Sequence, residues 1–279
     1  MNVYTAMSNS GLSFNEIRAG RSIGFVPTMG ALHEGHLSLV SEARAENDIV
    51  VCSIFVNPIQ FTNADDLKNY PRDTEKDKQM LAKEKCDILF LPSVEEMYPQ
   101  PATEKFDFGD LDKVMEGLHR PGHFNGVATV VKKLFEIVKP TRAYFGMKDY
   151  QQLVIIHHMV KTFKLPVEIV PCPIIRENNG LAMSSRNRLL SETEKMQASI
   201  LYDTLKMVKT RSGYDTIKEI KLEIEYQYKK NKYVLLEYFE IVDMYTLKSL
   251  TVWAESRHII ACIAANVGKV RLIDNFIIF

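Results

Sequence analysis

The chain has 279 residues, of which 46% are hydrophobic and 25% charged, a composition typical of a globular protein and unlike a disordered or fibrous one. Lys plus Arg and Asp plus Glu both total 35, so no excess positive charge favours a nucleic-acid partner. The first residues lack a basic start followed by an apolar core, and no apolar run could cross a bilayer. We therefore expect a cytoplasmic protein without a membrane partner. Four separated cysteines without a CxxC pair are expected to be reduced core residues.

Short apolar runs alternate with amphipathic segments through the first two thirds of the chain. The apolar runs predict strands over residues 23–27, 49–56, 87–91, 142–145 and 167–170. Apolar residues at helical spacing predict helices over residues 37–46, 74–84, 127–138 and 150–163. This alternation favours a parallel sheet with helical crossovers, whose ligands bind at the carboxyl ends of the strands.

The pattern changes near residue 175. A polar turn over residues 177–180 leads to a long helical stretch over residues 192–211 and then to a charged helix. Three β-type runs follow over residues 238–242, 258–265 and 270–273. We therefore predict an α/β protein with a Rossmann-like domain over residues 1–175 and a smaller α+β lid domain over residues 176–279. The turn at residues 177–180 is the hypothetical hinge.

The sharpest local pattern is the segment of residues 24–37, in which a strand runs through Gly30 and Gly35 into a helix. Its glycine spacing imitates a Walker A loop, but His36 and Leu37 replace the Lys-Ser/Thr pair, and no GxGxxG is present. A helix beginning near Gly35 would point free N–H groups at a phosphate, and His33 and His36 could donate to its oxygens. A structural histidine pair is the alternative, whereas zinc would require ligands that are not nearby.

Three further segments carry polar residues just after predicted strands or at the predicted boundary. Asn57 and Gln60 offer amides that could recognise a hydroxyl or a carboxylate, and Lys148 could meet an anion. Residues 184–186, Ser-Ser-Arg, suit triphosphate oxygens. Each segment also has a local interpretation, as a capped helix start or a polar hinge.

Taken together, these segments resemble the pantothenate synthetase family across nearly the whole chain, and His33 to His36 resembles the HxGH signature of the nucleotidyltransferase superfamily. The matching segments read PTMGALHEGH, NPIQF, YPRD, RPGHF, GMKDYQQ and GLAMSSRN. The resemblance implies an AMP-forming acid–amino-acid ligase. In that reaction ATP and pantoate give pantoyl adenylate and pyrophosphate, and β-alanine then yields pantothenate and AMP. Mg²⁺ and a homodimer are implied as well.

The resemblance also implies roles for individual residues. His36 matches the residue usually labelled proton donor, and His33, Lys148 and Arg186 complete the implied catalytic set. Gln60, Gln152 and Asn57 match positions for pantoate and β-alanine, and Asp77 matches a position that helps to hold Mg²⁺. The implied ATP contacts are Met29, Gly30, Ala31, Leu32, His33, Glu34, Gly35, His36, Gly146, Met147, Lys148, Asp149, Ile175, Met183, Ser184, Ser185 and Arg186.

Three rival interpretations stay open beside this one: a nucleotidyltransferase that stops after adenylyl transfer, a class I aminoacyl-tRNA synthetase, and a catalytically silent ATP-binding regulator. The amides of residues 57–60 and 148–152 favour a carboxylate-bearing substrate, and no basic tRNA-binding domain is visible. The chain departs from the family pattern at Asn125, where many relatives have Arg, and residues 62–68 match a variable flap over the site.

Overall fold

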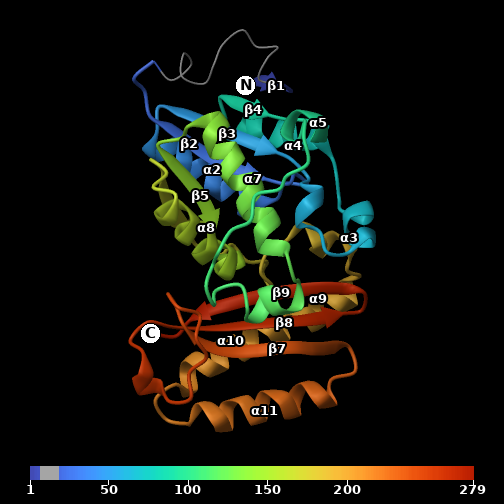
Figure 1. Cartoon of the computed structure of the whole chain (residues 1–279). Helices are drawn as coiled ribbons and strands as arrows, with labels where there is room; N and C mark the ends of the chain where they lie inside the picture. The colour runs from blue at the N-terminus through green and yellow to red at the C-terminus, as the bar shows by residue number, and fades with distance from the viewer. Residues whose placement is uncertain (7–18) are drawn as a thin grey trace.

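The computed structural model describes residues 1–6 and 19–279, which form two β-sheets (Figure 1). The larger sheet is parallel, with the strand order β1-β4-β3-β2-β5-β6. Its strands are β1 (Asn2–Tyr4), β2 (Ile23–Thr28), β3 (Ile49–Ile54), β4 (Ile88–Phe90), β5 (Arg142–Gly146) and β6 (Glu168–Cys172). The five predicted strands are confirmed. The sequence does not predict β1, because a strand of three residues is too short to show a period.

The predicted crossover helices are also present and cover both faces of this sheet. They are α2 (Glu34–Glu46), α4 (Thr74–Lys83), α7 (His123–Val138) and α8 (Tyr150–Thr162). Ile49 and Val51 pack in one cluster with residues of α7 and α8, whereas Val50 and Cys52 pack in another with residues of α2 and α4. Successive strand residues are therefore buried on opposite faces, which explains why these strands are continuous apolar runs.

Short elements fill the connections of this sheet. They are η1 (Pro58–Gln60), α3 (Ala64–Asn69), α5 (Val94–Met97), α6 (Met115–His119) and η2 (Met147–Asp149). Helix α3 overlaps the segment of residues 62–68 that the sequence analysis identified as a flap. Asn125 lies in the first turn of α7, where its side chain bonds to the Phe106 N–H and the Glu104 carbonyl. Asn125 therefore fastens the loop before α6.

The C-terminal part forms a three-stranded antiparallel sheet with three helices against it (Figure 1). Its elements are η3 (Ser185–Leu189), α9 (Glu192–Ala198), α10 (Ile200–Arg211), α11 (Ile217–Lys230), β7 (Val234–Asp243), η4 (Trp253–Glu255), β8 (Ile259–Val267) and β9 (Val270–Ile277). The long helix predicted over residues 192–211 is divided at Ser199. The Ser199 hydroxyl donates to the Met196 carbonyl, three residues earlier in the chain.

The predicted boundary near residue 175 lies where the chain leaves the parallel sheet after β6. A separate apolar cluster is built from residues 181–278, but Val242 and Ile260 of the smaller sheet pack with the cluster of α7 and α8. The turn at residues 177–180 is packed against Tyr202 of α10 and bonded to Asn187. These contacts attach the turn to the C-terminal part, and both the boundary and the hinge stay predictions.

The four cysteines are buried free thiols. Within residues 1–6 and 19–279, no helix combines the length and apolar character that a membrane span requires. The N-terminal segment considered in the sequence analysis includes residues 7–18, which lie outside the described residues.

An ion pair with a buried carboxylate joins α6 to the smaller sheet. The guanidinium of Arg271 on β9 donates to both carboxylate oxygens of Glu116 on α6, at 2.8 and 2.7 Å, and the Tyr238 hydroxyl donates to the same carboxylate. Burial alone would raise the pKa of Glu116, but the hydrogen bonds and charge of Arg271 outweigh it and lower that pKa. The carboxylate is therefore ionised near neutral pH.

Glu116→Gln should destabilise the fold by about 2 kcal/mol at pH 7, because it removes one of the two carboxylates that accept from Arg271 and leaves the guanidinium paired with Glu237 alone. The folded-state pKa of Glu116 lies below its ordinary value of 4.5, so its stabilising contribution exists above that pH and is lost as pH falls. Urea unfolding at pH 7 and pH 4 measures both effects. The control is Glu104→Gln, which removes the exposed ion pair with Lys132. Equal losses for both variants would contradict this role of Glu116.

Candidate active site

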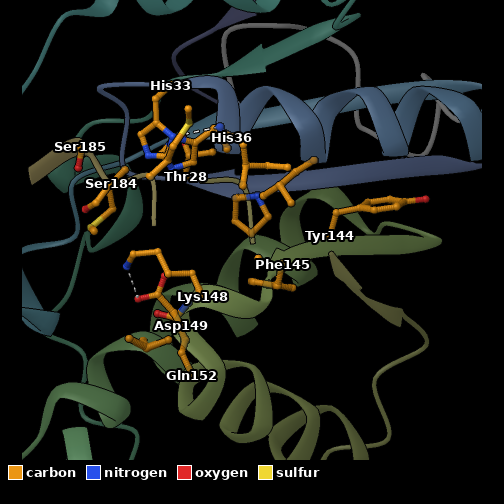
Figure 2. A pocket seen from close by; sticks show the side chains of 18 of the residues that line it. Thr28, His33, His36, Tyr144, Phe145, Lys148, Asp149, Gln152, Ser184 and Ser185 are labelled. Atoms are coloured by element: carbon orange, nitrogen blue, oxygen red, sulfur yellow. Dashed lines mark hydrogen bonds and ion pairs between the residues drawn. The ribbon is translucent and has the colours of Figure 1, made fainter. Parts of the chain in front are cut away.

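A pocket lies at the carboxyl edge of the parallel sheet, as the topology predicts. The neighbouring strands β3, β2, β5 and β6 deliver their following segments to it, and η3 of the C-terminal part faces them (Figure 2). Most predicted site residues line this pocket: Met29, His33, Gly35, His36, Gln60, Gly146, Lys148, Asp149, Gln152, Ile175, Met183, Ser184, Ser185 and Arg186. Gly30, Ala31, Leu32, Glu34, Met147, Asn57 and Asp77 are outside its lining.

The turn between β2 and α2 is held by a buried carboxylate. Gly30 and Ala31 have φ angles of 81° and 51°, a succession in which neighbouring N–H groups converge on an anion. Here the anion is Asp77 of α4, whose oxygens accept from the N–H groups of Ala31 and Leu32, each at 2.8 Å. Asp77 is only 1% exposed. These two N–H groups, which precede α2, are thus occupied within the protein.

The same turn places two imidazoles side by side. His33 is the N-cap of α2, and its Nδ1 accepts from the Gly35 N–H at 3.1 Å. A Cβ at Gly35 would lie 2.9 Å from the His33 ring, so only glycine permits this fold-back. The ring centroids of His33 and His36 are 4.1 Å apart. Burial, helped by the charges of Lys148 and Arg188, lowers the pKa of His33 to about 4.

His36 is the deeper of the two imidazoles. Burial, followed by the proximity of His33, Lys148 and Arg188, lowers the pKa of His36 well below its usual value. Its Nδ1 is buried and has no hydrogen-bond partner among the described residues. Both histidines are therefore neutral at physiological pH, and both line the pocket.

The segment after β3 contributes Gln60 to the pocket, but not Asn57. The Asn57 side chain is 1% exposed: its amide donates to Gln60 Oε1 and the Gly126 carbonyl, and its oxygen accepts from the Tyr98 hydroxyl. The ring of His123 bonds to the Gln60 carbonyl at 2.8 Å. Asn57, Tyr98 and His123 therefore fix Gln60. Sequence reasoning did not find Tyr98, because this contact joins residues that are far apart in the chain.

The segment after β5 presents a cation and an amide. Lys148 and Gln152 face the pocket, and Lys148 Nζ lies 3.7 Å from Asp149 Oδ1 (Figure 2). The adjacent Gln151 is buried and instead bonds to the backbone of residues 111–116. Two neighbouring glutamines thus have different roles, because consecutive helical residues point in directions about 100° apart.

The C-terminal part adds hydroxyls and a guanidinium through η3. Ser184 caps η3, and Ser185 lies 3.2 Å from the Tyr70 hydroxyl. Arg186 donates to Asp66 of α3 at 2.8 Å and lies over the Tyr70 ring. Arg186 is therefore ion-paired with a carboxylate of the flap segment, and an incoming triphosphate would compete with Asp66 for the guanidinium of Arg186.

Two further contacts join the C-terminal part to this pocket. The Met183 N–H donates to the Ile175 carbonyl at 3.0 Å, which places these two predicted ATP contacts next to each other. Arg188 donates to the Leu32 carbonyl at 2.7 Å, directly behind the histidine turn. The sequence analysis did not select Arg188, although it lies two residues after Arg186 on the same short helix.

Asp77 does not fit the predicted role of metal ligand. It is buried, and the Ala31 and Leu32 N–H groups already occupy both of its carboxylate oxygens. No group of three or more His, Cys, Asp or Glu residues that could hold a metal ion occurs in the described part of the chain. Asp77 is better explained as the residue that shapes the histidine turn, and no chemical step is assigned to a protein-held ion.

The fold and pocket define an α/β enzyme whose site lies at the carboxyl ends of parallel strands and combines imidazoles, cations and amides. The family model described as Pantoate-beta-alanine ligase matches residues 3–277. Curated proteins called pantothenate synthetase are 48% identical in Cytophaga hutchinsonii, with 94% of both chains covered, and 51% identical in Caldicellulosiruptor bescii, with 94% of this chain and 93% of the other covered.

Solved structures agree with this assignment. Pantothenate synthetase from Thermus thermophilus is 42% identical, with a TM-score of 0.91 and full coverage of both chains. Pantoate-beta-alanine ligase from Francisella tularensis, complexed with beta-gamma ATP and beta-alanine, is 37% identical, with a TM-score of 0.81 and coverage of 99% and 97%. The chain belongs to the pantoate-beta-alanine ligase family, and its function is the ligation of pantoate to β-alanine. The predicted family, enzyme class and fold class are confirmed.

Asp77→Asn should destabilise the protein by about 1–3 kcal/mol, because the new amide group would point donor hydrogens at one of two buried N–H groups. Urea unfolding without metal measures the change in the free energy of unfolding. Glu75→Gln is the matched control, since Glu75 lies on the same helix with a side chain that is 80% exposed. If Asp77→Asn were as stable as the control, Asp77 would not hold the turn.

Proposed function

We propose that the chain forms pantothenate through a pantoyl adenylate bound in this pocket. A pantoate carboxylate oxygen attacks the α-phosphorus of ATP and pyrophosphate leaves. The amine of β-alanine, after losing its proton, then attacks the acyl carbon, and AMP leaves with the oxygen that came from pantoate. The observation that carries this proposal is the convergence of two neutral imidazoles, Lys148, Arg186 and two glutamines on one pocket. The relative complexed with beta-gamma ATP and beta-alanine supports the choice of ligands.

The first step joins two anions, so the site must neutralise charge that develops on phosphoryl oxygens. Lys148 and Arg186 supply fixed positive charge beside the pocket. His33 accepts at Nδ1, so its proton lies on Nε2, where it can be donated to a phosphate oxygen. His36 retains an unbonded Nδ1. In this proposal both imidazoles act as neutral hydrogen-bond partners of the nucleotide, since their low pKa values disfavour imidazolium.

The second step depends on orientation. Gln60 and Gln152 enter the pocket from different segments and could bind the hydroxyls and carboxylates of pantoate and β-alanine. Asn57 then acts indirectly, by fixing the Gln60 amide. Holding an amine against the adenylate carbonyl contributes roughly 7–11 kcal/mol in favourable cases, so no covalent enzyme intermediate is required.

The mixed anhydride must also be shielded from water. The C-terminal part supplies Ser184, Ser185 and Arg186 from the far side of the pocket, which suits the predicted lid. The proposal includes four further features. They are two domains over residues 1–175 and 176–279, a homodimer, Mg²⁺ accompanying ATP, and a cytoplasmic location. These last features rest on the family resemblance and the sequence.

Pantoate-dependent exchange of labelled pyrophosphate into ATP, measured without β-alanine, tests the adenylate. His36→Ala should lower the exchange rate roughly 100- to 1,000-fold, because one preorganised partner of the reacting phosphate is lost. Its melting temperature should change little. His157→Ala, an exposed change on α8, is the control and should keep full exchange. Absence of exchange in the unmodified chain would reject the adenylate, and unfolding of His36→Ala would instead indicate a structural histidine.

Asp66→Asn should strengthen ATP binding about 2- to 5-fold, because Arg186 would no longer be held by a competing carboxylate. Isothermal titration with ATP gives the Kd. Asp65→Asn is the control, as Asp65 is the exposed neighbour on the same helix. Weaker ATP binding in Asp66→Asn would show that the ion pair assists binding rather than competing with the nucleotide.

A further inference from the structure

Asn275 of β9 reaches from the C-terminal sheet to the segment that carries Lys148. Its side chain is almost fully buried, and the amide donates to two carbonyls, those of Met147 at 2.9 Å and Lys148 at 2.8 Å. We propose that Asn275 is a positioning residue that holds Lys148 in place for the first step of the reaction. This inference rests on the proposed adenylate function.

The two carbonyls belong to η2, the short 3-10 helix between β5 and α8. Short 3-10 segments have poorer hydrogen-bond geometry than α-helices, and η2 lacks a side-chain cap. Lys148 extends from η2 into the pocket on a flexible four-carbon stem (Figure 2). Where its ammonium can reach therefore depends on the position of the backbone to which Asn275 is bonded.

Asn275 is itself fixed by a buried ion pair. Asp274 accepts from the Asn275 N–H at 2.8 Å and from the Arg176 guanidinium at 2.6 and 3.0 Å. Arg176 also donates to the Asn275 carbonyl, and it directly follows Ile175, which lines the pocket. A continuous set of contacts therefore runs from the pocket wall through Arg176, Asp274 and Asn275 to η2.

This arrangement has a functional consequence. The C-terminal part contributes to the site in two ways. Side chains at η3 line the pocket, and Asn275 is bonded to the backbone of the segment that carries Lys148. Asn275 also lines a small second pocket together with Lys148 and Gln152, next to the main one. Asn275 thus links the smaller sheet to η2, the segment that carries Lys148.

The test separates positioning of Lys148 from a general contribution to stability. Asn275→Ala should lower the pantoate-dependent pyrophosphate exchange rate about 10- to 100-fold at saturating ATP, because a displacement of about 1 Å can cost that much. In a Lys148→Ala background, the same change should cost less than about 3-fold, since residues that act as one unit are not additive. Asn266→Ala, in the same sheet on β8, is the control and should leave the rate unchanged.

Equal fold losses from Asn275→Ala with and without Lys148 would overturn the proposal, as would an unchanged rate in the single variant. Circular dichroism and melting temperature check folding, and Asn275→Ser, which keeps one donor, carries the test if the alanine variant unfolds. Unfolding of both variants would assign Asn275 to fold stability and likewise overturn the proposal.

Overall pantothenate formation is measured on the same proteins. If the unmodified chain makes pantothenate without exchange, the adenylate fails, and the coupling between Asn275 and Lys148 is still read from overall rates.

Discussion

The Asp77 carboxylate holds the turn on which the geometry of the pocket depends. Two consecutive residues with positive φ, Gly30 and Ala31, turn the chain sharply between β2 and α2, and a buried anion satisfies the N–H groups that this conformation exposes. With the turn fixed, His33 becomes the N-cap of α2 and His36 lies against it. A carboxylate that lies outside the pocket lining thus determines where both imidazoles are.

The distribution of charge around the pocket follows from burial. The imidazoles are neutral because they are desolvated and lie close to cations, whereas Lys148 and Arg186 lie beside the carboxylates of Asp149 and Asp66. A site of this kind offers both hydrogen-bond partners and positive charge to a triphosphate. The ion pair between Glu116 of α6 and Arg271 of β9 lies outside the lining of this pocket.

Much of the fold could be predicted from the sequence because burial on both faces produces continuous apolar strands, and parallel topology brings the ends of those strands together. The sequence also identified the segments that line the pocket. It could not assign Asn57, because an amide near a strand end can bind a ligand or a neighbouring side chain equally well, and only the tertiary contact with Gln60 decides. The long helix ending at residue 211 is likewise divided at Ser199, which helical periodicity does not reveal.

Contacts between distant segments account for the remaining differences. Asp77 bonds to a turn that lies 46 and 45 residues earlier in the chain, and Asn275 bonds to carbonyls 128 and 127 residues away. Neither residue has a local pattern that distinguishes it from an ordinary helix carboxylate or strand amide. The resemblance named Asp77 for a metal role, but the contacts of both residues are found only when the topology is known, and here they support the groups that the motifs had already indicated.

The central claim is that a pantoate oxygen bonds to the α-phosphorus of ATP in this pocket. Pantoate with both carboxylate oxygens replaced by ¹⁸O, incubated with the chain, ATP and β-alanine, tests it most directly by mass spectrometry of the products. The account predicts one ¹⁸O in AMP and one retained in pantothenate. AMP without label, or label in pyrophosphate or orthophosphate, would contradict it.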